Sequence, residues 1–237
     1  MKILSLEASA VSASAAVTEN GKILSSAYLN IGLTHSQTLL PLVNGVLKNA
    51  GLHIKDISAI AVSSGPGSFT GLRIAIALAK GLAEPLDLPC IGISSLEALA
   101  SLHADSDAVI CCVMDARCKQ VYNALFRAES GKITRLCNDR AVKCEGVIKE
   151  ISEIAKSEKV LICGDGADMF CNLTDLNKKI TKAAEINKYQ SAVGVGTVAE
   201  KMLKSGRGIN PKDLAPEYLR QSQAERELKL KKSEEKQ

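Results

Sequence analysis

The residues of this sequence most able to bind a charged ligand form a glycine-rich loop, SGPGSFTGLR, at 64–73. Glycine-rich turns that open helices often bind phosphate through backbone amides. No lysine follows the second glycine of a Gly-x4-Gly frame, so this is not a Walker loop. Two alternatives remain: a weak anion or nucleotide site, or a turn that only orients the next helix, and we favour the turn. The residues of this loop in question are Gly65, Gly67, Ser68 and Thr70.

The histidines and cysteines show no catalytic or metal-binding pattern. His35, His53 and His103 lie far apart in the sequence and match no metal-ligand spacing. No Ser, His and Asp constellation can be picked out for a peptidase. The eight cysteines include no Cys-x-x-Cys pair, so we expect free thiols. We therefore expect no catalytic residue, no metal and no cofactor.

The composition indicates a well-packed protein that is poor in aromatic residues. The 237 residues are 46% hydrophobic, with no Trp, three Phe and four Tyr. The core must therefore consist of Ile, Leu, Val and Ala, and a surface that stacks single-stranded bases is disfavoured. No segment resembles a signal peptide or a membrane span, so we expect a cytoplasmic protein with no membrane partner. We expect the charged residues 221–237 to form a frayed tail.

The elements that must position the loop recur in two similar halves. Strands are predicted at 1–9, 12–18 and 22–29, with an Asn-Gly hairpin turn before the third. The first half continues with a helix at 34–50, a strand at 57–65, a helix at 70–86, a strand at 89–94 and a helix at 94–103. The second half repeats the order with strands at 107–116, 119–128 and 133–138, a helix at 144–158, a strand at 160–164 and a late helix at 191–206.

This duplication predicts an N-terminal lobe at 1–104, a C-terminal lobe at 105–220 and the tail at 221–237. Two such lobes resemble the actin-like ATPase superfamily (ASKHA, RNase H-like fold), which has mixed sheets with helices on both faces. That resemblance implies that nucleotide, where it is bound, lies between the lobes. Fold likeness alone does not fix function.

The helix from Thr70 to Glu84 is apolar on almost every side. Its polar residues, Arg73, Lys80 and Glu84, share one face with Ala77. Because one lobe can cover only one side of such a helix, another surface must cover the rest.

The helix from Thr34 carries two apolar stripes. We assign one of them to the core face: Leu40, Val43, Leu47 and Ala50. The other contains Leu39, Leu42 and Val46, and we expect it to be an interface, the alternative being that it packs under a loop of the same chain. The predicted interface residues of both helices are His35, Thr38, Leu39, Leu42, Gly45, Val46, Arg73, Ile74, Ala77, Lys80 and Gly81.

Several segments together resemble one bacterial family. They are ILSLEAS, HSQTLLPLVNGVLKNAGL, SGPGSFTGLRIAIALAKGLA, MDARCKQVYNALF and the late PEYLR, in matching order over nearly the whole chain. They are similar to TsaB, the tRNA threonylcarbamoyladenosine biosynthesis subunit, a family also labelled as an M22-type glycoprotease. The resemblance implies a non-catalytic dimerisation and activating subunit. The complex adds a threonylcarbamoyl group to the adenosine next to the anticodon of tRNAs that read ANN codons.

The resemblance also implies partners: a TsaD-like catalytic paralogue that forms a heterodimer, a TsaE-like small ATPase, and tRNA reached through the complex. Without its paralogue, the chain could pair with a second copy through the same helices. The catalytic paralogue uses a His-x-x-x-His metal pair on the equivalent helix. In this chain the first position is His35, and Leu39 stands at the position of the second histidine. The alternative functions are a stand-alone nucleotide-binding ATPase or an M22-type peptidase.

Two turns of the fold also depart from the phosphate-binding pattern that the resemblance implies. Glu7-Ala8-Ser9 stands where the family often has Asp-Thr-Ser, and Asp115-Ala116-Arg117 replaces a glycine-rich turn. Asp115 and Arg117 could form an ion pair or contact a ligand. The stretch 164–167 could bind a nucleotide base or be a plain turn.

Overall fold

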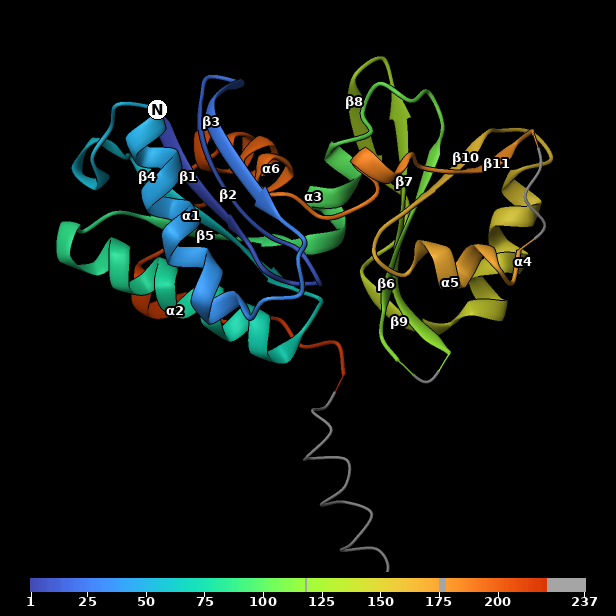
Figure 1. Cartoon of the computed structure of the whole chain (residues 1–237). Coiled ribbons are helices and arrows are strands. Elements are labelled where there is room, and N and C mark those ends of the chain that lie inside the picture. The colour runs from blue at the N-terminus through green and yellow to red at the C-terminus, as the bar shows by residue number, and fades with distance from the viewer. Residues whose placement is uncertain (118, 175–177, 221–237) are drawn as a thin grey trace, which may run out of the picture.

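The first sheet begins with an antiparallel meander of β1 (Lys2–Glu7), β2 (Ala13–Glu19) and β3 (Lys22–Leu29). Asn20 and Gly21, both at positive φ, form the turn between β2 and β3, as the sequence predicts. The computed structural model describes residues 1–117, 119–174 and 178–220, which fold into two lobes side by side (Figure 1).

Two parallel strands complete the first sheet, whose order is β3-β2-β1-β4-β5. They are β4 (Ala59–Gly65) and β5 (Cys90–Ser94). The helices α1 (His35–Asn49) and α2 (Phe69–Ala83) pack on one face of this sheet, and α3 (Ser95–Ser101) and α6 (Ala192–Lys204) pack on the other.

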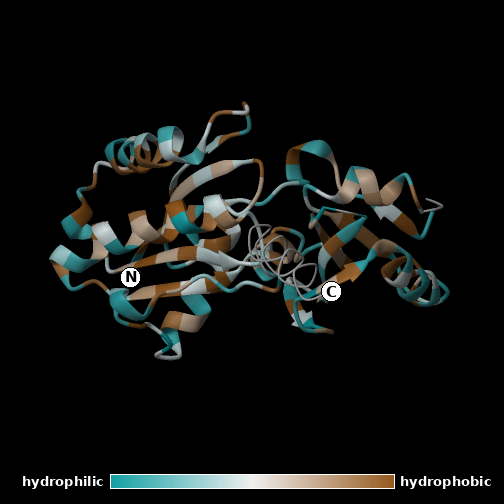
Figure 2. Cartoon of the chain, turned by 90° about the horizontal axis from the view of Figure 1, so that it is seen from below, coloured by the Kyte–Doolittle hydropathy of each residue, from teal (hydrophilic) through white to brown (hydrophobic). Residues whose placement is uncertain are grey.

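The second sheet repeats this plan, with order β11-β10-β6-β7-β8, and β9 also pairs with β7. Its strands are β6 (Val109–Asp115), β7 (Gln120–Glu129), β8 (Lys132–Arg135), β9 (Arg140–Lys143), β10 (Val160–Cys163) and β11 (Ile180–Lys182). The helices α4 (Cys144–Ile154) and α5 (Ala167–Cys171) cover one face, and α3 packs on the other. The strands contain many apolar residues, and the helices alternate apolar and hydrophilic ones (Figure 2).

The predicted extent of the C-terminal lobe, 105–220, is wrong at its end. Although α6 follows the second sheet in sequence, Val195 and Ala199 pack against Ile3 and Ala61 of the first sheet. The chain therefore returns to the first lobe after residue 190 and completes it. The predicted tail, 221–237, lies outside the described residues.

Short elements are what the sequence pattern missed. Neither β9 nor β11 is predicted, because strands of four and three residues are too short to show a period. Four 3₁₀ turns were also missed, at Ile54–Asp56, Glu84–Leu86, Glu185–Asn187 and Pro211–Asp213. The helix predicted at 70–86 ends as an α-helix at Ala83.

Candidate interaction surface and inter-lobe cleft

The loop between β4 and α2 is a close-packed turn. Gly65 has φ +138°, and a Cβ there would come within 3.0 Å of the Glu217 carbonyl oxygen. A Cβ on Gly67 would come equally close to the Ser9 carbonyl oxygen. Since real Cβ atoms do not approach so closely, packing alone requires glycine at both positions.

The same loop fixes the start of α2. The Ser68 amide donates to the Ser9 carbonyl oxygen at 2.7 Å, so a protein acceptor already occupies it. The Ser68 hydroxyl accepts from the Gly71 amide at 3.3 Å, which makes Ser68 the N-cap of α2. The next amides, of Phe69 and Thr70, have no acceptor among the described residues.

A cleft of about 480 Å³ lies between the lobes, next to this helix start. Ser9, Gly67, Ser68 and Thr70 line its wall on the first lobe, and Asp115, Arg117 and Asp165 line the wall on the second. The Asp115 carboxylate accepts from the Arg117 amide at 2.7 Å, so it is bound by backbone. Burial raises the pKa of Asp165 to about 6, and Gln190 donates to its carboxylate at 2.9 Å. Arg117 and Arg220 also line the cleft, so its lining holds two carboxylates and two guanidinium groups.

Glu7, at the end of β1, is fully buried, and its carboxylate is used within the protein. It accepts from the Ser9 amide at 2.6 Å and from the Ser63 hydroxyl. Burial raises its pKa, which the hydrogen bonds from Ser63 and Ser9 only partly offset. Glu7 is therefore a packed internal group and does not line the cleft.

His35 is turned inward at the start of α1. Its Nε2 atom lies 2.8 Å from the Ala10 carbonyl oxygen, to which it donates as the Nε2–H tautomer. Its ring also lies 3.0 Å from the Cβ position of Gly71. The ring therefore ties α1 to the turn after β1 and to the first turn of α2.

The assignment of the two stripes of α1 is wrong for the predicted interface stripe and for Leu40 of the predicted core stripe. The predicted interface residues Thr38, Leu39, Leu42 and Val46 are at most 8% exposed and lie inside this chain. Leu40, predicted to face the core, is 44% exposed, although Val43 and Leu47 are buried as expected. Leu40 lies on the side of the helix that carries the exposed Gln37, Asn44 and Lys48, whereas the rest of both stripes is buried or half-buried.

The outward residues of α2 agree better with the predicted surface. Arg73, Ala77 and Gly81 are exposed, and Ile74 and Lys80 are half-buried. No atom lies within 4 Å of a Cβ placed on Gly81. We call a set of exposed and half-exposed residues of the two helices the outer face; they are Leu40, Pro41, Asn44, Gly45, Arg73, Ile74, Ala77 and Gly81.

The C-terminal segment covers part of α2, which the sequence did not predict. Tyr218 stacks on Phe69 with ring centroids 4.3 Å apart, and its hydroxyl accepts from Arg73 at 2.8 Å. Lys80 donates to the Lys212 carbonyl oxygen at 3.0 Å. The only signal in the sequence was the PEYLR motif, whose position in space its residues do not reveal.

Comparison with known proteins identifies the family of this chain. The family model of TsaD, described as tRNA N6-adenosine threonylcarbamoyltransferase, matches residues 31–228. The tRNA threonylcarbamoyladenosine biosynthesis protein TsaB of Bacillus subtilis is 30% identical over 95% of this chain and 96% of that protein. The chain belongs to the TsaB family. The TsaB of Escherichia coli is 28% identical over 96% of this chain and 98% of that protein.

A solved structure supports the fold of this TsaB-family chain. A Pseudomonas aeruginosa protein, described as uncharacterized with similarity to peptidase YEAZ, superposes with a TM-score of 0.81 at 27% identity. The match covers 92% of this chain and 99% of that one. The predicted actin-like fold of two mixed α/β lobes is confirmed. TsaB-family membership makes the chain a component of the tRNA threonylcarbamoyladenosine biosynthesis machinery.

Three observations on the described part of the chain bear on other functions. It contains no group of three or more His, Cys, Asp or Glu side chains placed to bind a metal. Its seven cysteines are free thiols. None of its helices combines the length and the apolar character needed to cross a bilayer.

Proposed function

We propose that this chain is the non-catalytic dimerisation and activating subunit of its tRNA-modification complex. It pairs with a TsaD-like catalytic paralogue, and a TsaE-like ATPase joins the assembly. The complex adds a threonylcarbamoyl group to the adenosine next to the anticodon of tRNAs that read ANN codons. The observation that carries this proposal is the outer face of α1 and α2, which combines exposed apolar residues with small ones.

The outer face suits a partner with similar helices. Ala77 and Gly81 lie one turn apart on α2, and Gly45 has no atom within 4 Å of its Cβ position on α1. Small residues on adjoining turns let a second helix approach closely, at the short end of the usual 8–10 Å interaxial range. The match to the TsaD family model supports a paralogue of the same fold as that partner. Without the paralogue, a second copy of this chain would use the same face.

The internal residues support a subunit that does not catalyse the transfer. Leu39, one turn after His35, is 1% exposed and has no metal-binding atom. The Nε2 atom of His35 is bonded to Ala10, and the carboxylate of Glu7 is bonded to Ser63 and Ser9. These groups hold the first lobe together and are not free to bind a metal or an attacking group.

The glycine-rich loop acts as a turn that aims α2 toward the partner. The close approaches of Gly65 and Gly67 and the occupied amide of Ser68 support this role. The amides of Phe69 and Thr70 are the only part of the helix start left for an anion within the described residues. Nucleotide binding by this loop is the weaker alternative, since the Ser68 amide is already bonded to the Ser9 carbonyl oxygen.

The deciding experiment is copurification with the TsaD-type paralogue from the same genome. It is combined with mass spectrometry of threonylcarbamoyladenosine in tRNA from cells depleted of the native chain. We expect Ala77→Glu to lose both the paralogue and the modification, because an unpaired carboxylate would be buried between the helices. The matched control is Ser152→Glu, an exposed position on α4 of the other lobe, which should behave as wild type.

Three results would count against the proposal. Normal pairing and modification with Ala77→Glu would remove the outer face as the interface. ATP hydrolysis by the purified chain alone, at a rate that a mock purification lacks, would favour the ATPase alternative. Threonylcarbamoyl transfer or peptide hydrolysis by the chain alone would contradict a non-catalytic role.

A further inference from the structure

The short helix α3 belongs to both lobes at once. On one side, Ala98 packs with Ile91 and Ile93 of the first sheet and with Val195 of α6. The contact with α6 is close, because a Cβ on Gly194 would come within 3.0 Å of the Ala98 carbonyl oxygen. This side of α3 is part of the core of the first lobe.

The other side of α3 is part of the core of the second lobe. Leu96 and Leu99 pack in one cluster with Ile110, Met114 and Phe126 of the second sheet. All five side chains are at most 1% exposed. The apolar core is therefore continuous from one lobe to the other, and a hinge motion would have to open it to water.

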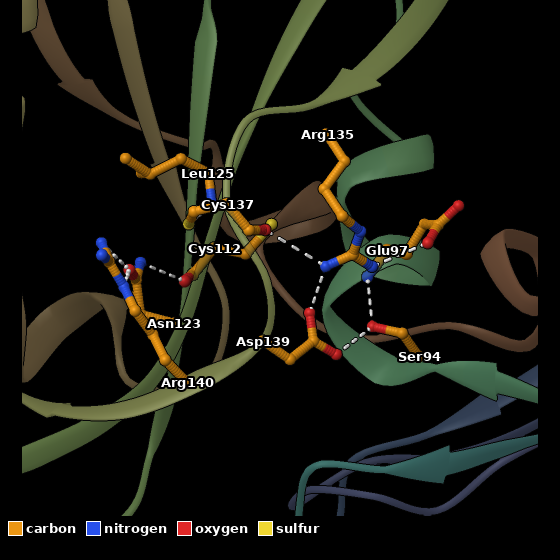
Figure 3. A network of polar contacts seen from close by, with 9 residues as sticks. All are labelled: Ser94, Glu97, Cys112, Asn123, Leu125, Arg135, Cys137, Asp139 and Arg140. Carbon is orange, nitrogen blue, oxygen red and sulfur yellow. Dashed lines mark hydrogen bonds and ion pairs between the residues drawn. The ribbon is translucent and has the colours of Figure 1, made fainter.

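A polar clamp reinforces this contact at the N-terminal end of α3 (Figure 3). Arg135 of β8 donates from Nη2 to the Glu97 carboxylate at 2.7 Å, and from Nη1 to Asp139. Asp139 in turn accepts from the Ser94 hydroxyl at 2.5 Å. Ser94 and Glu97 come from the first lobe, and Arg135 and Asp139 from the second, so the Arg135–Glu97 and Ser94–Asp139 bonds cross between the lobes. The Arg135–Asp139 bond lies within the second lobe.

The clamp is held in place within the second lobe. The Arg135 guanidinium lies 4.7 Å from the centroid of the Phe126 ring, which fixes its plane by a cation–π contact. Arg135 is 28% exposed, Asp139 15% and Glu97 40%, so solvent screens the Asp139 contact less than the Glu97 contact. The two terminal nitrogens of the guanidinium bind two different carboxylates, so one arginine links Glu97 to Asp139.

A second tie crosses the lobes at the cleft. The Glu217 amide donates to the Ser64 carbonyl oxygen at 2.7 Å, which anchors the C-terminal segment on the first lobe. Three residues on, the Arg220 guanidinium donates to the Ala116 carbonyl oxygen in the turn after β6. The lobes are thus joined on the cleft side as well as through α3.

We infer that α3 and the Arg135 clamp fuse the two lobes into one rigid body, so that the inter-lobe cleft keeps a single width in solution. The two places where the chain crosses between lobes, 102–108 and 188–191, act as fixed connections and not as hinges. This inference concerns the chain alone and stands whether or not the proposed function is correct. A cleft that cannot close has no route to ligand-driven lobe closure, and the outer face is presented to a partner in one orientation.

Amide hydrogen exchange of the full chain, followed by mass spectrometry, tests this inference. The reporters are the peptides that span the two crossings; they contain amides bonded in the rigid form, such as His103 to Ala100. We expect slow exchange at both crossings in the wild type. We expect Arg135→Gln to accelerate exchange there and in α3 by about tenfold, with the remaining peptides unchanged.

Arg127→Gln is the matched control. Arg127 makes a two-bond contact with Glu158 at 2.9 and 2.8 Å, but both residues belong to the second lobe. Its loss should leave the crossings unchanged. If Arg135→Gln does not fold, Glu97→Gln removes one arm of the clamp and carries the same expectation.

The pattern of exchange decides the outcome. Acceleration confined to the crossings and α3, and absent in the control, supports the fused lobes. Wild-type crossings that exchange as fast as an unstructured peptide would overturn the inference. So would equal effects of the clamp and control variants, or acceleration spread evenly over the chain, because either would mean that the clamp adds only general stability.

Discussion

The helices α1 and α2 lie on the same face of the same sheet and have the same length, yet their sequences disclose their outward faces unequally. On α2, the exposed Arg73, Ala77 and Gly81 lie four residues apart, and the charged residue marks the side that faces away from the sheet. On α1, the outward side carries the exposed Gln37, Asn44 and Lys48, but the apolar Leu40 and Pro41 lie among them. Hydrophobic period therefore locates an outward face less clearly when apolar residues share it with polar ones.

The largest expected effect is a contrast in stability between substitutions at two neighbouring residues of α1. Leu39→Glu should prevent folding of the first lobe, because it places a carboxylate in the core at a cost of more than about 4 kcal/mol. Leu40→Glu should keep the free energy of unfolding within about 0.5 kcal/mol of the wild type and weaken pairing with the paralogue. Circular dichroism melts and pull-downs measure the two effects. Equal stability of both variants would show that α1 does not turn Leu39 toward the core and Leu40 away from it.

The next largest effect compares two glycines of α2. A Cβ on Gly71 would come within 3.0 Å of the Ala8 carbonyl oxygen, whereas a Cβ on Gly81 would have no atom within 4 Å. Gly71→Ala should lower the free energy of unfolding by about 1–3 kcal/mol, since backbone must shift to admit the methyl group. Urea unfolding of the purified chain measures it. A variant as stable as the wild type would mean that α2 does not begin so close to β1.

A pH series tests the residue that lies beneath the starts of both helices. Because burial raises the pKa of Glu7 in the folded state, folding binds a proton, and this carboxyl destabilises the fold as pH rises above its ordinary value of 4.5. Glu7→Gln cannot ionise, so its melting temperature should rise relative to the wild type between pH 4.5 and 8. A difference that is constant with pH, or that grows toward acid, would contradict an ionisable buried Glu7.

The smallest effect separates folding from pairing on the outer face. Gly81→Ala should raise the free energy of unfolding by about 0.5–1 kcal/mol, because alanine is the better helix former and its methyl group meets open space. The same methyl group should weaken pairing if the partner helix approaches closely there. Calorimetry on the free chain and titration with the paralogue give the two values. Stronger pairing would place the partner elsewhere.

Local sequence signals predicted the elements and their ends correctly where one short-range interaction decides them. The Asn20–Gly21 turn is the example. Ser94 caps α3, since its hydroxyl accepts from the Glu97 amide at 3.1 Å. The side chain of Glu97, however, bonds to Arg135 in the other lobe, which no local pattern signals.

The sequence by itself determined the order of strands and helices, their duplication, the chain's resemblance to its family and the outward residues of α2. The tertiary structure decided that both stripes of α1 are buried except at Leu40, that α6 returns to the first lobe, that the segment around Tyr218 covers α2 and that α3 is shared between the lobes. The physical reason is range. Turns, caps and periods depend on residues a few positions apart, whereas the burial of a given apolar side chain depends on which distant surface lies against it.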